Sequence, residues 1–156
     1  MKKFALYTFL CIALASCSIH RIYSEPLVYS EGVEYQIEGI VTHKFFESGQ
    51  GANSTVHFAG KEGRFKRLQI VVKNNTKEIQ PLNLTDFELL DENDNHYQPC
   101  YVMQTLKIND NINVLERKIK PGKKKTFIIQ YCETFPKDDV PKLKVKNVLI
   151  PLPEKK

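Results

Sequence analysis

The chain has 156 residues and a formal net charge of +5, from 23 Lys and Arg residues against 18 Asp and Glu residues. This length fits one domain with a sizeable hydrophobic core. The excess of basic residues is too mild to indicate a protein that binds nucleic acid, so no nucleic-acid partner is expected.

The first 16 residues have the features of a secretory signal. Lys2 and Lys3 precede an uncharged, mostly apolar run over residues 4–15, as in the charged n-region and short h-region of such a signal. A stable membrane-spanning helix needs about 20 apolar residues, so this run is too short to remain as an anchor. We therefore expect residues 1–16 to be cleaved, which leaves 140 residues with 21 basic and 18 acidic side chains.

The signal ends in Leu14-Ala15-Ser16-Cys17, which resembles the lipobox of bacterial lipoproteins. In that family the Cys sulfur receives a diacylglyceryl group, the signal is cut before the Cys, and the new amine is usually acylated. The resemblance implies that Cys17 is the lipidation site of a membrane-anchored, extracytoplasmic chain, because two or more acyl chains hold a protein stably at a bilayer. If the source is Gram-negative, the same resemblance implies that the protein is sorted to the outer membrane, because Asp does not follow Cys17 directly. Ordinary cleavage near Ala15 or Ser18, with release of a soluble protein, is the alternative.

Residues 18 to about 31 have mixed polarity and no hydrophobic period. We expect residues 17–32, starting at the lipidated Cys17, to form a tether that lifts the folded domain off the membrane. The pattern changes at Val33, where apolar residues begin to alternate with polar ones as far as Val41. This period of two predicts a half-buried β-strand.

Residues 47–63 hold four of the seven glycines and several small polar residues, a composition that predicts a long, mobile loop. His43 and His57 lie beside these glycines and could meet across a hairpin as two nitrogen ligands of a metal ion. Two surface histidines without a ligand are the simpler interpretation. We favour it because a copper-carrying sandwich would combine Met with His, and Met103 is the only methionine of the mature chain.

Two strands are predicted in the middle of the chain. Residues 66–73 alternate between polar and apolar side chains and end at the turn Asn74-Asn75-Thr76, whose residue types favour turns. Residues 82–89 predict a second strand with a bulge or break near Thr85-Asp86.

A polar hairpin turn is predicted from Asp91 to Asn95, leading into a strand over residues 97–103. The spacing of its Asp and Asn residues imitates the start of an EF-hand calcium loop. However, His96 and Val102 stand where that loop requires Gly and Glu, so a polar turn without calcium is expected.

The last third of the chain contains one ambiguous stretch and two clear strand signals. Residues 104–118 fit neither period, so we expect a loop with a short strand or a helical turn. Residues 126–132 alternate regularly and predict a strong strand. Residues 142–152 continue with an alternating and then an apolar run, before a charged tail over residues 153–156.

A cluster of lysines surrounds the turn Lys120-Pro121-Gly122-Lys123, and Lys124 and Lys125 follow it directly. Lys120, Lys123, Lys124 and Lys125 are therefore candidate binding residues for anionic lipid headgroups or acidic envelope polymers, through a salt-sensitive attraction. The simpler interpretation, which we favour, is that these lysines solvate a turn and protect edge strands from pairing.

Two of the four cysteines remain once Cys11 leaves with the signal and Cys17 is lipidated. In an oxidising compartment we expect Cys100 and Cys132 to form a disulfide. Closing a loop of about 33 residues stabilises a fold by about 3 to 4 kcal/mol on the chain-entropy model. Two free buried thiols, or a metal site, are the alternatives. Alternation also places Tyr97, Tyr101 and Tyr131 near these cysteines, which predicts an aromatic cluster.

Some seven or eight short strands, no convincing helix and frequent turn residues predict an all-β fold. Three strand and turn patterns carry a more specific indication: Leu68-Gln-Ile70-Val-Val72-Lys-Asn74-Asn-Thr76, Phe87-Glu-Leu89-Leu-Asp91, and Ile119-Lys-Pro121-Gly122 before Phe127-Ile-Ile129. They resemble the telokin-like, immunoglobulin-like domains of bacterial secreted proteins and lipoproteins, a family of unknown function. The resemblance implies an immunoglobulin-like antiparallel β-sandwich over residues 33–152.

No catalytic arrangement stands out in the sequence. The mature chain has four histidines and no Gly-x-Ser-x-Gly nucleophile elbow, and the family resemblance supplies neither catalytic residues nor a cofactor. We therefore expect a non-enzymatic binding module of the cell envelope. It would present residues 47–63 and 104–118 to a protein or polymer partner. The alternative is a carrier of a small ligand or metal on the same scaffold, using His43 and His57.

Overall fold

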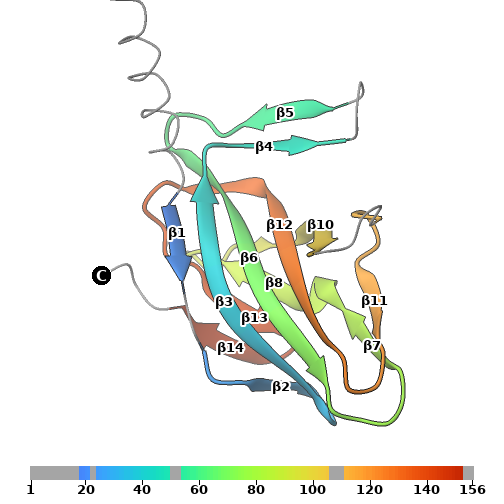
Figure 1. Cartoon of the computed structure of the whole chain (residues 1–156). Coiled ribbons are helices and arrows are strands. Elements are labelled where there is room, and N and C mark those ends of the chain that lie inside the picture. Colours follow the sequence, from blue (N-terminus) through green and yellow to red (C-terminus); the bar gives the residue numbers. More distant parts are fainter. Residues whose placement is uncertain (1–17, 22–23, 50–53, 106–110, 153–156) are drawn as a thin grey trace, which may run out of the picture.

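The computed structural model describes residues 18–21, 24–49, 54–105 and 111–152, which form two facing layers of antiparallel strands (Figure 1). The predicted signal peptide, the lipidation site Cys17 and the charged tail lie outside these residues. Within the described part of the chain, no helix has both the length and the apolar character needed to span a membrane.

The larger layer is a six-stranded sheet in which β1, β3, β6, β12 and β10 follow one another and β2 also pairs with β3. Its long central strands are the segments with the clearest alternation in the sequence, which confirms those strand predictions. The bounds are β1 Ser18–Arg21, β2 Leu27–Ser30, β3 Val33–His43, β6 Gly63–Asn74, β10 Pro99–Gln104 and β12 Lys124–Pro136.

The second layer consists of a four-stranded sheet in the order β14, β13, β8 and β9, and a two-stranded sheet of β11 and β7. A single 3-10 turn, η2, separates β7 from β8 and confirms the predicted break near Thr85-Asp86. The bounds are β7 Gln80–Asn83, η2 Leu84–Asp86, β8 Phe87–Leu90, β9 His96–Tyr97, β11 Glu116–Ile119, β13 Lys142–Val145 and β14 Val148–Pro151.

The hydrophobic core lies between the two layers and takes every second residue of their strands. Ile70 of β6 and Ile129 of β12 meet Phe87 and Leu143 of the second layer, and all four are fully buried. Side chains of a strand point alternately to its two faces, so the same strands must also present a second, outer face. That outer face of the larger sheet holds the candidate site described below.

The predicted polar turns are confirmed. The Asn74 side chain is fully buried and accepts the backbone N–H of Thr76 at 2.8 Å, while its amide donates to the Ile119 carbonyl at 2.9 Å. The Asp91 carboxylate accepts the backbone N–H groups of Asn93 and Asn95, both at 2.9 Å. These side chains replace backbone partners at the points where the strands end.

The predicted tether over residues 17–32 is wrong for two of its segments, which are strands of the larger sheet. In β1, Ser18 pairs with Thr42 of β3, and in β2, Leu27 pairs with Tyr35 of the same strand. An edge strand as long as β3 would otherwise expose a row of unpaired backbone N–H and C=O groups. The mixed polarity of this segment, which suggested a linker, is compatible with an edge strand that has one face in water.

The predicted loop over residues 47–63 is also wrong in part, because its described residues include strands. Here β4 (Phe45–Ser48) and β5 (Thr55–Phe58) form a two-stranded antiparallel hairpin. Phe45 pairs with Phe58, and Phe46 with His57. Cross-strand aromatic pairs of this kind stabilise a hairpin despite the glycines between its strands.

The strand predicted over residues 97–103 is divided between the two layers. β9 ends at Tyr97 and pairs with β8, whereas β10 begins at Pro99 and pairs with β12 in the larger sheet. The ambiguous stretch over residues 104–118 contributes the start of a short strand, β11, at Glu116. Its residues 106–110 lie outside the described part of the chain.

Candidate functional site

The hairpin of β4 and β5 has two different faces. Its inner face carries Phe46 and His57, whose rings stack with centroids 4.6 Å apart. Its outer face carries Phe45, Val56 and Phe58, because residues directly opposite each other on paired strands point to the same side. Glu47, opposite Val56, lies on the same side; we call the three apolar residues Phe45, Val56 and Phe58 the hairpin face.

Phe46, on the inner face, packs on the outer side of the larger sheet and closes a second hydrophobic cluster, whereas His57 and the rest of β5 are exposed. The Phe46 ring meets the Phe65 ring edge-on at 4.6 Å and lies 6.1 Å from the Tyr101 ring. All three rings are buried, and the cysteines at positions 100 and 132 pack against them. The β4 strand of the hairpin is therefore joined through Phe46 to a cluster that is separate from the core between the layers.

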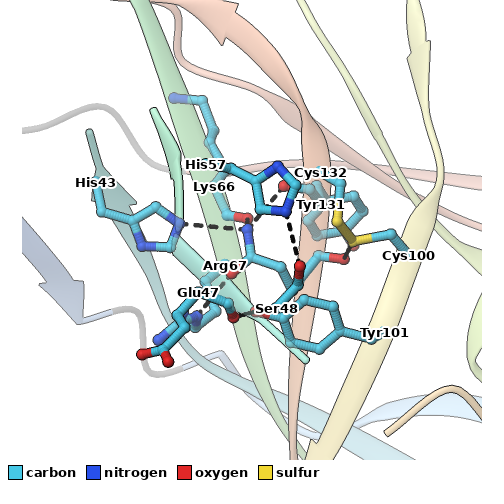
Figure 2. The surroundings of a disulfide bond; sticks show 11 residues. His43, Glu47, Ser48, His57, Lys66, Arg67, Cys100, Tyr101, Tyr131 and Cys132 are labelled. Carbon is cyan, nitrogen blue, oxygen red and sulfur yellow. Dashed lines mark hydrogen bonds between the residues drawn. A yellow bond between two sulfur atoms is a disulfide. The ribbon is translucent and has the colours of Figure 1, made fainter. Parts of the chain in front are cut away.

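The predicted disulfide is confirmed and belongs to this second cluster. Cys100 of β10 and Cys132 of β12 are bonded, with Cα atoms 5.8 Å apart (Figure 2). The bond crosses two neighbouring strands of the larger sheet at the point where their register shifts between Pro99 and Tyr101. It thus ties the edge strand β10 to the centre of the sheet below the hairpin.

A buried polar group lies beside the aromatic cluster. The Gln130 side chain is fully buried. Its amide donates to the Tyr131 carbonyl at 2.8 Å and to the His43 Nε2 at 3.3 Å, while its oxygen accepts the Arg67 Nε–H at 2.9 Å. These bonds satisfy polar atoms that would be costly to bury alone. Sequence reasoning missed this group, because Gln130 and Arg67 occupy ordinary polar positions of alternating strands.

The His43 imidazole is neutral in this environment. Burial, and secondarily the neighbouring Arg67 charge, lower its pKa from 6.5 to about 4. An amide nitrogen can only donate, so the contact with Gln130 favours the tautomer in which the His43 Nε2 carries no proton and accepts.

The two histidines predicted as candidate metal ligands are not paired as ligands in the structure. His57 Nε2 lies 2.7 Å from the Ser48 Oγ, whereas His43 bonds Gln130 (Figure 2). His43 packs near the Phe65 ring and His57 on the Phe46 ring. Among the described residues, no group of three or more His, Cys, Asp or Glu side chains is arranged to hold a metal ion.

The Ser48 and His57 side chains form a hydrogen-bonded hydroxyl–imidazole pair. Nucleophilic catalysis also needs a third group that orients the base, and donors for the developing oxyanion. In the described part of the chain, His57 has Ser48 as its only hydrogen-bond partner. The contact joins β4 to β5, which also pair through their backbones.

The hairpin face is unusually apolar for a surface. Phe45 is 52% exposed, Val56 47% and Phe58 75%, and the two phenylalanine rings lie 6.0 Å apart. Single exposed apolar residues are normal on proteins, but adjacent aromatic rings on a projecting hairpin are typical of a contact surface. The composition of residues 47–63 gave no sign of it, since Phe45 lies outside that stretch and only the strand pairing brings it beside Phe58.

The four candidate lysines gather at the turn between β11 and β12, as predicted. The Lys123 N–H donates to the Lys120 carbonyl at 3.1 Å, and Gly122 has a φ of +64°, which favours glycine. Lys120, Lys123 and Lys124 are exposed and Lys125 is half-buried. In Figure 1 this turn lies at the end of the sandwich opposite to the hairpin.

The lysines of β13 belong to a different surface. Lys142 forms an ion pair with Asp94 at 2.9 Å, and Lys144 with Glu88 at 3.3 Å. Both lie on the second layer, since β13 pairs with β8 and β14. They therefore do not extend the group of lysines at the β11–β12 turn.

The predicted aromatic cluster around the cysteines is divided between the two faces of the larger sheet. Tyr101 joins Phe46 in the outer cluster, as expected from its position beside Cys100. Tyr131 points into the main core, where its hydroxyl donates to the Phe87 carbonyl at 2.7 Å. Tyr97 also belongs to the main core, because β9 is part of the second layer.

The chain matches no protein-family model and no curated protein sequence. Its fold is similar to that of solved structures. One is a conserved hypothetical protein from Bacillus anthracis, with a TM-score of 0.54 and 16% identity over 85% of this chain and 93% of that one. Another is an uncharacterized beta-sandwich protein from Clostridium difficile 630, with a TM-score of 0.52 and 16% identity over 80% and 84% of the two chains.

The fold is a β-sandwich. This confirms the predicted all-β, antiparallel architecture. At 16% identity the similarity concerns the fold alone. The immunoglobulin-like subtype and the lipoprotein identity stay predictions from the sequence.

Proposed function

We propose that the protein is a membrane-anchored, extracytoplasmic lipoprotein whose immunoglobulin-like β-sandwich is a non-enzymatic interaction module of the cell envelope. The observation that carries the proposal is the hairpin face. Two phenylalanine rings and a valine are displayed to solvent on a hairpin that is itself fixed by a buried cluster. An exposed apolar surface of this kind is typical of a site that binds a partner.

The disulfide supports the proposed address. Structural disulfides persist in oxidising compartments and are rare in the cytosol of most organisms. The Cys100–Cys132 bond joins two strands of the main sheet and packs against the cluster under the hairpin. It fits a domain exported behind a signal and anchored through Cys17.

The lysines of the β11–β12 turn provide a second surface for a partner. Lys120, Lys123 and Lys124 are exposed at the end of the sandwich remote from the hairpin. A group of ammonium ions at such a turn suits an acidic envelope polymer, through an attraction that salt weakens. The module would then contact two different partners at its two ends.

Mass spectrometry of the protein from its native membrane tests the proposed anchor. The expected mature chain begins at Cys17 with the added mass of acyl groups. A chain that begins elsewhere and carries no acyl mass would rule out the lipoprotein proposal.

Photo-crosslinking in living cells tests the proposed surface. Benzoylphenylalanine in place of Phe58 is expected to give discrete adducts, either with an envelope protein or with lipid. The same group in place of Ile79, which is 57% exposed near the opposite end, serves as the matched control. Equal crosslinking at both positions would mean that the hairpin face is not a specific contact surface.

A further inference from the structure

We propose that the hairpin face is occupied by the lipid bilayer itself, so that the hairpin seats the domain directly on the membrane that holds its anchor. This inference rests on the proposed function, because it requires the acyl groups on Cys17. It follows from the strand with which Ser18 pairs, and from the side chains that this end of the sandwich exposes.

The folded domain begins directly after the anchor site. β1 starts at Ser18, one residue after Cys17, and Ser18 pairs with Thr42 near the end of β3. One residue spans at most about 3.6 Å of extended chain. An acylated Cys17 would therefore hold this end of the larger sheet at the membrane surface, with no intervening spacer.

The hairpin grows from that same end. β3 ends at His43 and β4 begins at Phe45, three residues beyond the partner of Ser18, which is about 10 Å along a strand. Figure 1 shows the start of β1 and the hairpin together at one end of the sandwich. The element closest to the anchor is thus the one that displays the exposed aromatic rings.

The exposed residues at this end suit a membrane interface. Phe45, Val56 and Phe58 present apolar side chains on one face, while Lys44 and Lys61, near the base of the hairpin, are exposed. Apolar rings enter the boundary between headgroups and acyl chains, and lysine stems lie along it with their ammonium groups among the phosphates.

The remaining residue of the outer face limits how deeply the hairpin enters. Glu47 lies opposite Val56 and accepts a hydrogen bond from the Ser54 hydroxyl. A carboxylate is costly to bury in hydrocarbon. The hairpin would therefore stay at headgroup depth with its rings toward the acyl chains.

This placement also orients the domain. β3 has 11 residues, so its two ends lie about 35 Å apart. The lysine turn would face away from the bilayer, and its partner would be a soluble or polymeric component of the envelope. Without the hairpin contact, a single attachment at Cys17 would leave the domain free to tilt.

A single tryptophan tests the inference, because the chain contains none of its own. Two variants are purified in acylated form: Phe58→Trp on the hairpin face, and Ile79→Trp as the control. Ile79 follows the turn after β6, whose last residue, Asn74, pairs with Val33 at the far end of β3. Both proteins are reconstituted into vesicles of phosphatidylcholine and phosphatidylglycerol, with and without brominated acyl chains.

The expected result is a blue-shifted emission at position 58 that brominated lipid quenches, with neither effect at position 79. If the protein is acylated and bound to vesicles but the tryptophan at position 58 is not quenched, the bilayer is not the occupant. The anchored module would then stand, and a protein adduct in the photo-crosslinking experiment would identify the actual partner. A chain without acyl groups that does not bind vesicles would refute both proposals.

Discussion

Replacing His43 with glutamine should flatten the pH dependence of stability. His43 is buried at the end of β3, where its Nε2 accepts a hydrogen bond from the Gln130 amide. A glutamine at position 43 keeps a side-chain acceptor but cannot be protonated in this range. His43→Gln therefore removes one titrating group while keeping the buried polar arrangement close to its original form.

The sign and size of the effect follow from the pKa of His43, which burial and Arg67 lower from 6.5 to about 4. As pH falls, the unfolded chain binds the proton first, so the folded state loses stability relative to it. The stabilising contribution is complete above about pH 6.5 and is lost as pH falls toward about 4. The loss amounts to about 1 kcal/mol at about pH 5.5 and about 2 to 3 kcal/mol at about pH 4.5.

Urea unfolding of both proteins across this pH range measures the effect. The other titrating groups are common to both chains, so the difference between the two stability curves isolates His43. NMR titration of the His43 ring in the folded protein provides an independent reading of its pKa. Parallel stability curves, or a folded-state pKa near 6.5, would refute the argument that His43 is buried and neutral.

Three other substitutions test the structure by urea unfolding. Replacing both Cys100 and Cys132 with alanine should lower the free energy of unfolding by about 3 to 4 kcal/mol, and reductant should lower that of the wild type by the same amount. An unchanged wild-type stability on reduction would show that the bond does not form. Phe46→Ala should lower the free energy of unfolding by about 3 kcal/mol because the ring is buried, whereas Phe45→Ala should change it by no more than about 0.5 kcal/mol. Equal losses would contradict a hairpin with one buried and one exposed face. Asn74→Ala should lower the free energy of unfolding by about 2 kcal/mol, because the Thr76 N–H and the Ile119 carbonyl lose their partner. An unchanged urea midpoint would mean that water replaces the Asn74 side chain at these two groups.

The exposed hairpin face and the buried cluster beneath it explain why a surface hairpin has a defined position. Phe46 and Tyr101 fill the space between the hairpin and the sheet, and the disulfide holds β10 below them. A contact surface built on such a support needs little ordering when it binds, and this lowers the entropic cost of association. The same support would be required for contact with a bilayer or with a protein.

Much of the larger sheet could be predicted from the sequence. Alternation in residues 33–41, 66–73 and 126–132 identified its three long strands, because one face of each strand is buried in the main core. The turns at Asn74 and Asp91 were predictable as well, since the side chains that replace backbone partners there lie next to them in the sequence. The cysteine pair followed from how few cysteines remain in the mature chain.

The candidate site was not predictable in the same way, because its parts meet only through pairing between distant segments. The stretch before Val33 has no period of its own, and it becomes two strands because the free edge of β3 offers backbone partners. Phe45 and Phe58 become one surface through the register of the hairpin. The sequence alone determined the three long strands and the polar turns, since those preferences are local. The tertiary structure decided which faces are buried, which rings reach solvent, and that Ser18 pairs near the end of β3 from which the hairpin continues.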